Sequence, residues 1–121
     1  LSDRVEGSYN AHEKIILKDG ESMQLVVIDD IIYCNAEGSY TTFYLKNNRQ
    51  IITSLNLKEY ERMLSPYGFI RSHHSYLINL NHIASIQKSD GGYIIMKDDS
   101  LVPLSSAKKD EFFELLVALN Q

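Results

Sequence analysis

The sequence predicts a mainly β fold: small antiparallel sheets of short strands, with one short internal helix and a C-terminal helix. Most of the chain consists of short runs rich in Ile, Val, Tyr and Thr, which turn signals such as Asp19-Gly20 and Gly91-Gly92 separate. Helical periodicity appears only in the middle of the chain and at its end. These two observations favour β sheets over a helical or alternating α/β architecture.

Turn chemistry defines the strands before the internal helix. Asp19-Gly20 is a strong two-residue turn signal between β-formers, so a hairpin surrounds it. The turn Ala-Glu-Gly-Ser separates the next two runs, and Asn47-Asn48 breaks the chain before the fifth. The expected strands are residues 14–17, 21–28, 31–35, 41–45 and 50–53.

The internal helix has a start signal, an apolar stripe and a stop signal. Asn56 followed by Glu59 has the form of a capping box, in which each side chain satisfies a free backbone N–H. Ser65-Pro66 ends the helix, because a residue before proline is pushed out of the α region. The stripe consists of Leu57, Tyr60, Met63 and Leu64.

The remaining chain returns to β structure and closes on a helix. An apolar stretch at residues 69–83 is followed by strands expected at 84–88, 93–96 and 101–104. Ser105 or Ser106 can cap the C-terminal helix. Its apolar stripe consists of Phe112, Leu115, Leu116 and Leu119.

Composition limits the function classes. The 121 residues fit one domain, and no apolar run approaches the ~20 residues that a membrane-spanning helix needs. The lone Cys34 cannot form an internal disulfide, so we expect a cytoplasmic protein with no membrane contact. The net charge of −4 disfavours indiscriminate coating of nucleic acid. We expect residues 1–13 to be a linker from a preceding domain that this sequence lacks, and residues 14–121 to form the domain.

The stretch Phe-Ile-Arg-Ser-His-His-Ser-Tyr at residues 69–76 concentrates reactive side chains. A zinc site needs ligands that converge, whereas His73 and His74 should point to opposite faces of an extended segment. Ser75 beside His74 in sequence is not a nucleophile and base in space. We therefore expect no enzyme activity, no metal and no cofactor, and we expect Cys34 to be a buried, inert thiol.

The order of these motifs resembles the LytTR family of bacterial DNA-binding domains. The resemblance runs through Asn-Ala-Glu-Gly-Ser-Tyr-Thr-Thr-Phe-Tyr-Leu at residues 35–45, the stretch 54–64 that contains the internal helix, and the segment 69–83. The family's second motif matches at Phe69, Arg71, His73, His74, Ser75, Tyr76, Leu77, Ile78 and Asn79. The resemblance implies a mainly β domain that reads successive major grooves with loops and has no recognition helix.

The resemblance also implies which residues contact DNA. The first loop spans residues 38–41, the second 71–75 and the third 105–109, and we expect the three to share one face. His74 occupies the position that the family uses for a polar contact. Many members carry Arg or Lys where this chain has His74, and Arg where it has Ser106, so two fixed charges are missing here. The candidate DNA-binding residues are Ser39, Thr41, Arg71, His73, His74, Ser75, Ser106, Lys108 and Lys109.

Several of these residues also have structural interpretations. Tyr76, Leu77 and Ile78 fit a core, and Tyr40 fits a packed strand aromatic better than a base-stacking platform. For Arg71 the sequence favours an ion pair and a phosphate contact equally. For Asn79 we expect a structural role, in which its side chain hydrogen-bonds the nearby backbone. Lys108 and Lys109 oppose the helix dipole unless an anion lies there.

The sequence thus favours sequence-specific duplex DNA binding, as the output domain of a bacterial two-component response regulator. The resemblance implies an N-terminal receiver domain in the parent chain and a dimer on paired DNA sites. One alternative is a β-rich module that binds a protein or peptide by strand addition and has no DNA affinity. A zinc-dependent hydrolase is the third, and it would require an ion bound by His73 or His74.

Overall fold

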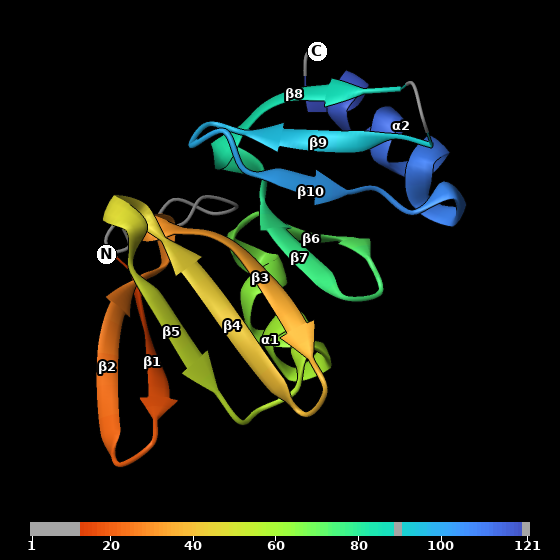
Figure 1. The fold of residues 1–121 in the computed structure, drawn as a ribbon. Helices are drawn as coiled ribbons and strands as arrows, with labels where there is room; N and C mark the ends of the chain where they lie inside the picture. The colour runs from red at the N-terminus through yellow and green to blue at the C-terminus, as the bar shows by residue number, and fades with distance from the viewer. Residues whose placement is uncertain (1–12, 89–90, 120–121) are drawn as a thin grey trace.

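A computed structural model describes residues 13–88 and 91–119. Within these ranges the chain forms ten strands and two α-helices, which Figure 1 shows as two stacked parts. The strands are β1 (Lys14–Asp19), β2 (Ser22–Val27), β3 (Ile31–Glu37), β4 (Tyr40–Leu45), β5 (Gln50–Thr53), β6 (Phe69–His73), β7 (Tyr76–Asn79), β8 (Ile83–Gln87), β9 (Tyr93–Met96) and β10 (Leu101–Pro103). The helices are α1 (Leu57–Leu64) and α2 (Lys109–Leu119).

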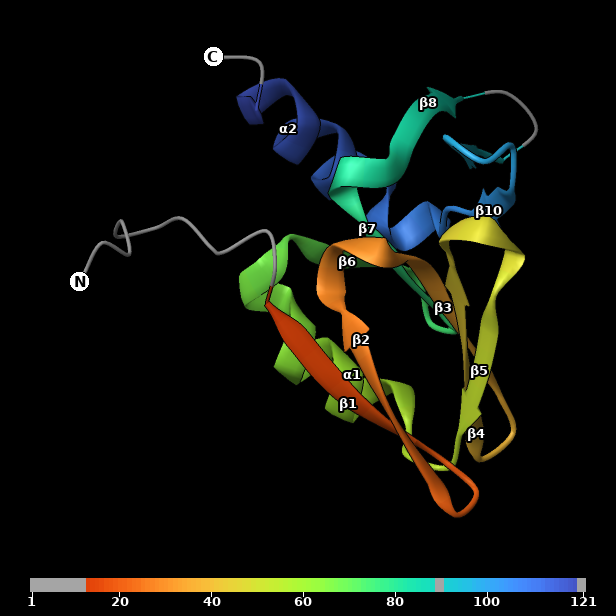
Figure 2. The same cartoon turned by 90° about the vertical axis from the view of Figure 1, so that its left-hand side faces the viewer.

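All strand pairs in the described chain are antiparallel and belong to small sheets. The hairpin β1–β2 stands alone, the central sheet has the order β5-β4-β3-β7-β6, and the third sheet has the order β10-β9-β8. Figure 2 shows the hairpin lying across from the central sheet, with α1 between them. The predicted fold class is confirmed.

The first core lies between the central sheet, the hairpin and α1. Asn56 caps α1 by accepting a hydrogen bond from the backbone N–H of Glu59 at 3.0 Å, as the sequence predicts. The carboxylate of Glu59 pairs with Arg62. The side chains that α1 and the hairpin bury here are Leu17, Val26, Leu57, Tyr60 and Leu64, which pack against Cys34, Phe43, Ile51 and Leu77 of the central sheet. Burial raises the pKa of the Cys34 thiol, which agrees with the expected inert cysteine.

The second core joins the opposite face of the central sheet to the third sheet and α2. Its buried residues are Ile32, Ile78, Ile94, Met96, Val102, Leu104 and Phe112. The change of core occurs within β3, where the register shifts between Ile31 and Tyr33. Ile31 faces the first core and Ile32 the second, as strand alternation requires. Because of the shift, Tyr33 also packs against the second core, and Cys34 returns to the first.

Some boundaries differ from the sequence predictions. The apolar stretch at residues 69–83, in which a loop is expected at 71–75, forms the hairpin of β6 and β7, then a short 3-10 turn at Leu80–His82 and the start of β8. Residues 1–12 of the predicted linker lie outside the described residues, but the carbonyl of Glu13 already accepts a hydrogen bond from the N–H of Ile28 at 2.8 Å. Ser105, and not Ser106, is the capping residue at the last helical segment, where its hydroxyl accepts from the N–H of Ala107 at 3.2 Å. No described helix is long and apolar enough to cross a membrane.

Candidate nucleic-acid interface

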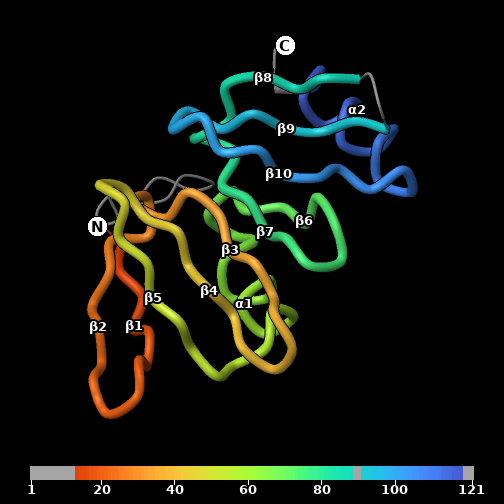
Figure 3. Tube along the Cα trace, viewed as in Figure 1, coloured from red at the N-terminus to blue at the C-terminus, as the bar shows by residue number. Residues whose placement is uncertain are grey.

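The three predicted loops lie side by side along one edge of the molecule. The N–H of Ala36, near the end of β3, donates to the carbonyl of Ser75 at 2.8 Å. The N–H of Ser105 donates to the carbonyl of Ser72, also at 2.8 Å. The β6–β7 turn is therefore held between the other two segments, as the Cα trace in Figure 3 shows. We call residues 38–40, 73–75 and 105–109 together the loop edge.

The β3–β4 turn contributes exposed polar and aromatic groups. Gly38 has a φ of 62°, which permits the tight reversal between the two strands. Ser39 is exposed at the tip, and Tyr40 beside it is 54% exposed. The interpretation of Tyr40 as a packed strand aromatic is wrong for this chain, because its ring faces solvent at the loop edge. Its position directly after an exposed turn is the sequence signal that favours an exposed ring.

Thr41 corrects the prediction for this loop. The residue is completely buried, and its hydroxyl donates to the carbonyl of Leu55 at 2.8 Å. Strand alternation explains the burial, since Tyr40 and Thr41 must point to opposite sides of β4. The hydroxyl that sequence reasoning assigned to DNA instead ties β4 to the segment before α1.

Arg71 is engaged inside the protein. Its guanidinium Nη1 lies 2.5 Å from Oε1 of Glu61 on α1, and Nη2 donates to the carbonyl of His74 at 2.7 Å. Only 19% of the side chain is exposed. Of the two interpretations that the sequence left balanced, the geometry favours the ion pair. Glu61 has no counterpart in the sequence-based site, because no local pattern links it to a residue ten positions later.

The two imidazoles lie together, contrary to the expectation of opposite faces. The ring centroids of His73 and His74 are 4.4 Å apart. The reason is a register shift between Arg71 and His73, after which His74 stands in the turn and not in a strand. His73 is half-buried and His74 is exposed.

A local hydrogen bond determines which ring nitrogen of His73 lacks a proton. Its Nδ1 accepts from the N–H of Ser75 at 3.1 Å, so in this arrangement Nδ1 carries no proton. Burial, and then the neighbouring His74, lower the pKa of His73. His73 and the Ser75 backbone therefore shape the turn, whereas the His74 ring is available to a ligand.

The third segment leads into α2. Ser106 is exposed and Lys108 is half-buried, and within the described residues neither side chain has a polar partner. Lys109 is the first residue of α2, and its Nζ donates to the carbonyl of Lys88 at 3.3 Å. The N–H groups of Ala107, Lys108 and Lys109 already have acceptors in Ser105 and Ser106, so the segment offers an anion a hydroxyl and cationic side chains.

A row of aromatic rings supports the loop edge from behind. Tyr44, Tyr33 and Tyr76 lie on β4, β3 and β7, with ring centroids 4.5 Å apart for the first pair and 6.1 Å for the second. The His73 ring meets Tyr76 edge-on at 5.7 Å. Burial raises the pKa of Tyr33 to about 12, and Tyr44 adds to the shift. These rings stack across neighbouring strands and fix the position of His73.

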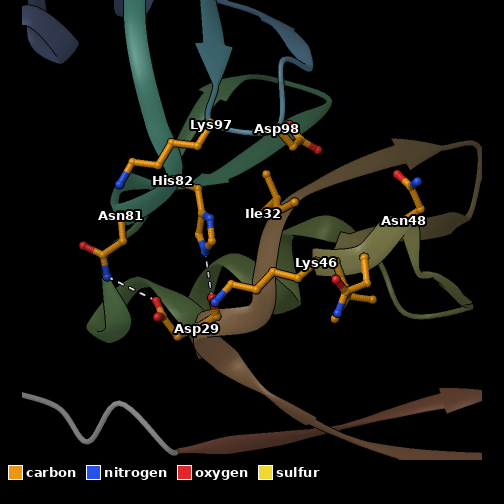
Figure 4. A pocket seen from close by; sticks show the side chains of 10 residues that line it. Asp29, Ile32, Lys46, Asn48, Asn81, His82, Lys97 and Asp98 are labelled. Atoms are coloured by element: carbon orange, nitrogen blue, oxygen red, sulfur yellow. Dashed lines mark hydrogen bonds between the residues drawn. The ribbon is translucent and has the colours of Figure 1, made fainter.

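A separate cleft of about 580 Å³ lies where the short 3-10 turns meet the β9–β10 turn, away from the loop edge. Figure 4 shows Asn81 and His82 pointing toward Asp29. His82 Nε2 is 2.7 Å from the carbonyl of Asp29, and Asn81 donates to its carboxylate at 3.3 Å. The lining mixes cations and carboxylates, and it contains none of the predicted site residues. These contacts connect the first and second parts of the fold.

Comparisons with known proteins agree with this architecture. The family model described as the LytTr DNA-binding domain matches residues 21–117. The sensory transduction protein LytT of Oceanobacillus iheyensis is 32% identical over 108 residues, which cover 86% of this chain and 44% of LytT. The transcriptional regulatory protein YpdB of Escherichia coli is 32% identical over 108 residues, which cover 87% of this chain and 44% of YpdB. The chain thus spans less than half the length of either relative.

A solved structure has the same fold. It is described as the LytTr DNA-binding domain of a response regulator from Bacillus cereus. The two structures superpose with a TM-score of 0.74 and 26% identity, covering 85% of this chain and 95% of the other.

Proposed function

The chain belongs to the LytTR family of DNA-binding domains, and on that premise we propose that its loop edge is the surface that binds duplex DNA sequence-specifically. The observation that carries the proposal is the continuity of the loop edge. Two backbone hydrogen bonds, from Ala36 to Ser75 and from Ser105 to Ser72, join the chain at the bases of its three segments, so contacts from all three are held in fixed relative positions. Fixed spacing is what a protein needs to match the regular repeat of phosphates and base edges along a duplex.

Each segment supplies a group that suits a nucleic acid. The hydroxyls of Ser39 and Ser106 can donate to, or accept from, a base edge or a phosphate. The exposed ring of Tyr40 offers an apolar surface with a polar tip. His74 can donate from one nitrogen and accept at the other, and Lys108 can contact phosphate. In this proposal His73, Ser75 and Arg71 support the turn from within, and Lys109, at the start of α2, contacts phosphate.

We propose further that the domain is the output part of a cytoplasmic bacterial response regulator. The relatives are more than twice as long as the matched region, which leaves room in them for a receiver domain. In this proposal residues 1–13 link a receiver to the domain at residues 14–121, and phosphorylation of the receiver brings two copies onto paired DNA sites. The domain itself acts by binding and not by catalysis.

Selection of bound duplexes from a random pool, at a stated salt concentration, tests the function and supplies the target sequence. The interface is then tested with two variants that make the same charge change, Lys108→Glu on the loop edge and Lys18→Glu on the hairpin. Lys108→Glu should weaken binding to the selected duplex and flatten the log–log salt dependence by about one unit, whereas Lys18→Glu should have little effect. Equal losses in both variants would contradict the assignment of the loop edge.

One observation favours the alternative of a peptide-binding module. The outer face of the hairpin exposes Ile16 by 56%, Met23 by 68% and Leu25 by 64%. An extended peptide could pair with the edge of β2 and continue this apolar face with its own side chains. If the selection recovers no enriched duplex, binding of the chain to a random peptide library, lost in Leu25→Ser, would favour this alternative.

A further inference from the structure

The contacts of Arg71 join helix α1 to the turn that carries His74. One terminal nitrogen of the guanidinium meets the carboxylate of Glu61, and the other meets the backbone carbonyl of His74. Both contacts are short hydrogen bonds from a charged donor, the class that contributes most per bond. One planar group thus fixes two points that lie on different elements of the fold.

The turn needs such a support because its strand pairing is irregular. The pairs of β6 and β7 run regularly from Phe69↔Asn79 to Arg71↔Leu77, and the register then shifts to His73↔Tyr76. A regular hairpin orients its turn through ladder hydrogen bonds, which a register shift interrupts. Here the Arg71 side chain bonds the carbonyl of His74, and His73 bonds the N–H of Ser75 at 3.1 Å.

Arg71 is poorly placed to leave these partners for a phosphate. Its side chain is 19% exposed, and its Nε is buried without a hydrogen-bond partner among the described residues. To reach DNA, the guanidinium would have to abandon Glu61 and leave that carboxylate unpaired beside a polyanion. Partly buried charge pairs that lose one member are costly, so the exchange is unfavourable.

We infer that Arg71 and Glu61 are positioning residues for DNA binding. The pair holds the His74 carbonyl, and with it the orientation of the peptide on which the His74 ring stands at the loop edge. Arg71 makes no contact with DNA in this arrangement, and Glu61 contributes to affinity although it is an acid. This inference rests on the proposed function of the loop edge and adds the residues that set its geometry.

The charge of Glu61 makes the test decisive. Removing an acidic group near a DNA-binding surface ordinarily strengthens binding, because it reduces repulsion of the phosphates. The inference predicts the opposite sign: Glu61→Gln should weaken binding to the selected duplex by about tenfold, the size of one charge-assisted hydrogen bond. Glu59→Gln is the matched control, since it makes the same change on α1 and releases only the exposed Arg62. That control should bind as the unmodified chain does, or slightly more tightly.

A second variant separates positioning from phosphate contact. Arg71→Lys keeps the charge but replaces a planar fork with a single ammonium, which cannot reach Glu61 and the His74 carbonyl together. It should weaken specific binding while the slope of the log–log salt dependence stays unchanged. A phosphate-contacting Arg71 would instead tolerate lysine, and Arg71→Ala would then lower the slope by about one unit.

Two further measurements exclude a general loss of structure. Urea unfolding gives the folded fraction of each variant at the assay temperature. Amide NMR spectra of the free proteins should show shifts at His74 and Ser75 in Glu61→Gln and none there in Glu59→Gln. If the unmodified chain binds its selected duplex and Glu61→Gln binds equally or more tightly, the inference is overturned and the proposed function stands. If the unmodified chain binds no duplex, the proposed function itself fails.

Discussion

Thr41→Val tests whether the Thr41 hydroxyl belongs to the fold or to the DNA interface. Valine keeps the shape of threonine in its fully buried site but removes the donor that bonds the Leu55 carbonyl at 2.8 Å. Leu55 is 40% exposed, so water can partly satisfy the abandoned carbonyl. The loss should therefore be near the net value of one hydrogen bond, about 1 kcal/mol in the free energy of unfolding.

Urea unfolding followed by circular dichroism measures this loss. With a denaturant dependence of about 2 kcal/mol per molar, the midpoint should fall by roughly 0.5 M. Thr41→Ser is the control, because it keeps the donor and removes one methyl group, at a cost of about 1 kcal/mol. Under conditions where each variant is fully folded, both should bind the selected duplex with unchanged affinity. A Thr41→Val protein that keeps its stability but binds DNA less tightly would refute the structural role and would show that Thr41 contacts DNA.

Three further predictions concern titration, charge and buried polar groups. Because the pKa of His73 is lowered in the folded chain, the unfolded chain takes up more protons as pH falls below about 6.5, and the free energy of unfolding should decrease there. His73→Asn, which keeps an acceptor for the N–H of Ser75, should show a smaller decrease between pH 7.5 and 5.5 in urea unfolding, and an equal decrease would contradict the assignment. Lys109→Ala should flatten the salt dependence of DNA binding by about one unit, and an unchanged slope would show that Lys109 makes no phosphate contact. Asn79→Ala should cost about 2–4 kcal/mol, since the buried amide donates to one backbone group and accepts from another, whereas Ser72→Ala should cost nothing, because its buried hydroxyl has no partner among the described residues. Thermal unfolding of the two variants checks both values, and a stability loss in Ser72→Ala would reveal a bond for that hydroxyl.

Local sequence signals predicted much of the fold because their physics is local. Asp19-Gly20 produced the expected hairpin, and Asn56 capped the internal helix that ends before Pro66. Asn79 bonds the N–H two residues ahead, as expected of a polar residue between strands. Its second bond, to the carbonyl of Ile31 at 2.9 Å, joins positions 48 residues apart, and no local pattern indicates it.

The site was less predictable because its residues acquire their roles through tertiary contacts. An arginine in a polar turn is typical of a phosphate contact. Only the tertiary approach of Glu61 on α1 gives Arg71 a partner inside the protein. His73 and His74 were assigned to opposite faces on the rule of strand alternation, which fails where the register shifts. Family resemblance predicts three segments that the structure brings to one edge, but it could not separate the residues that face outward from those that support them.

The division of β3 between two cores limits how such domains can diverge over evolution. Ile31 and Ile32 are neighbours that face different cores, so each can drift among apolar residues of similar volume without disturbing the other core. Loss or gain of one residue there would instead exchange the two cores, sending every later side chain of β3 to the wrong face. Among natural relatives we therefore expect residues 31–33 to vary in identity but to be free of insertions and deletions, while the exposed tip at Gly20 tolerates changes in length.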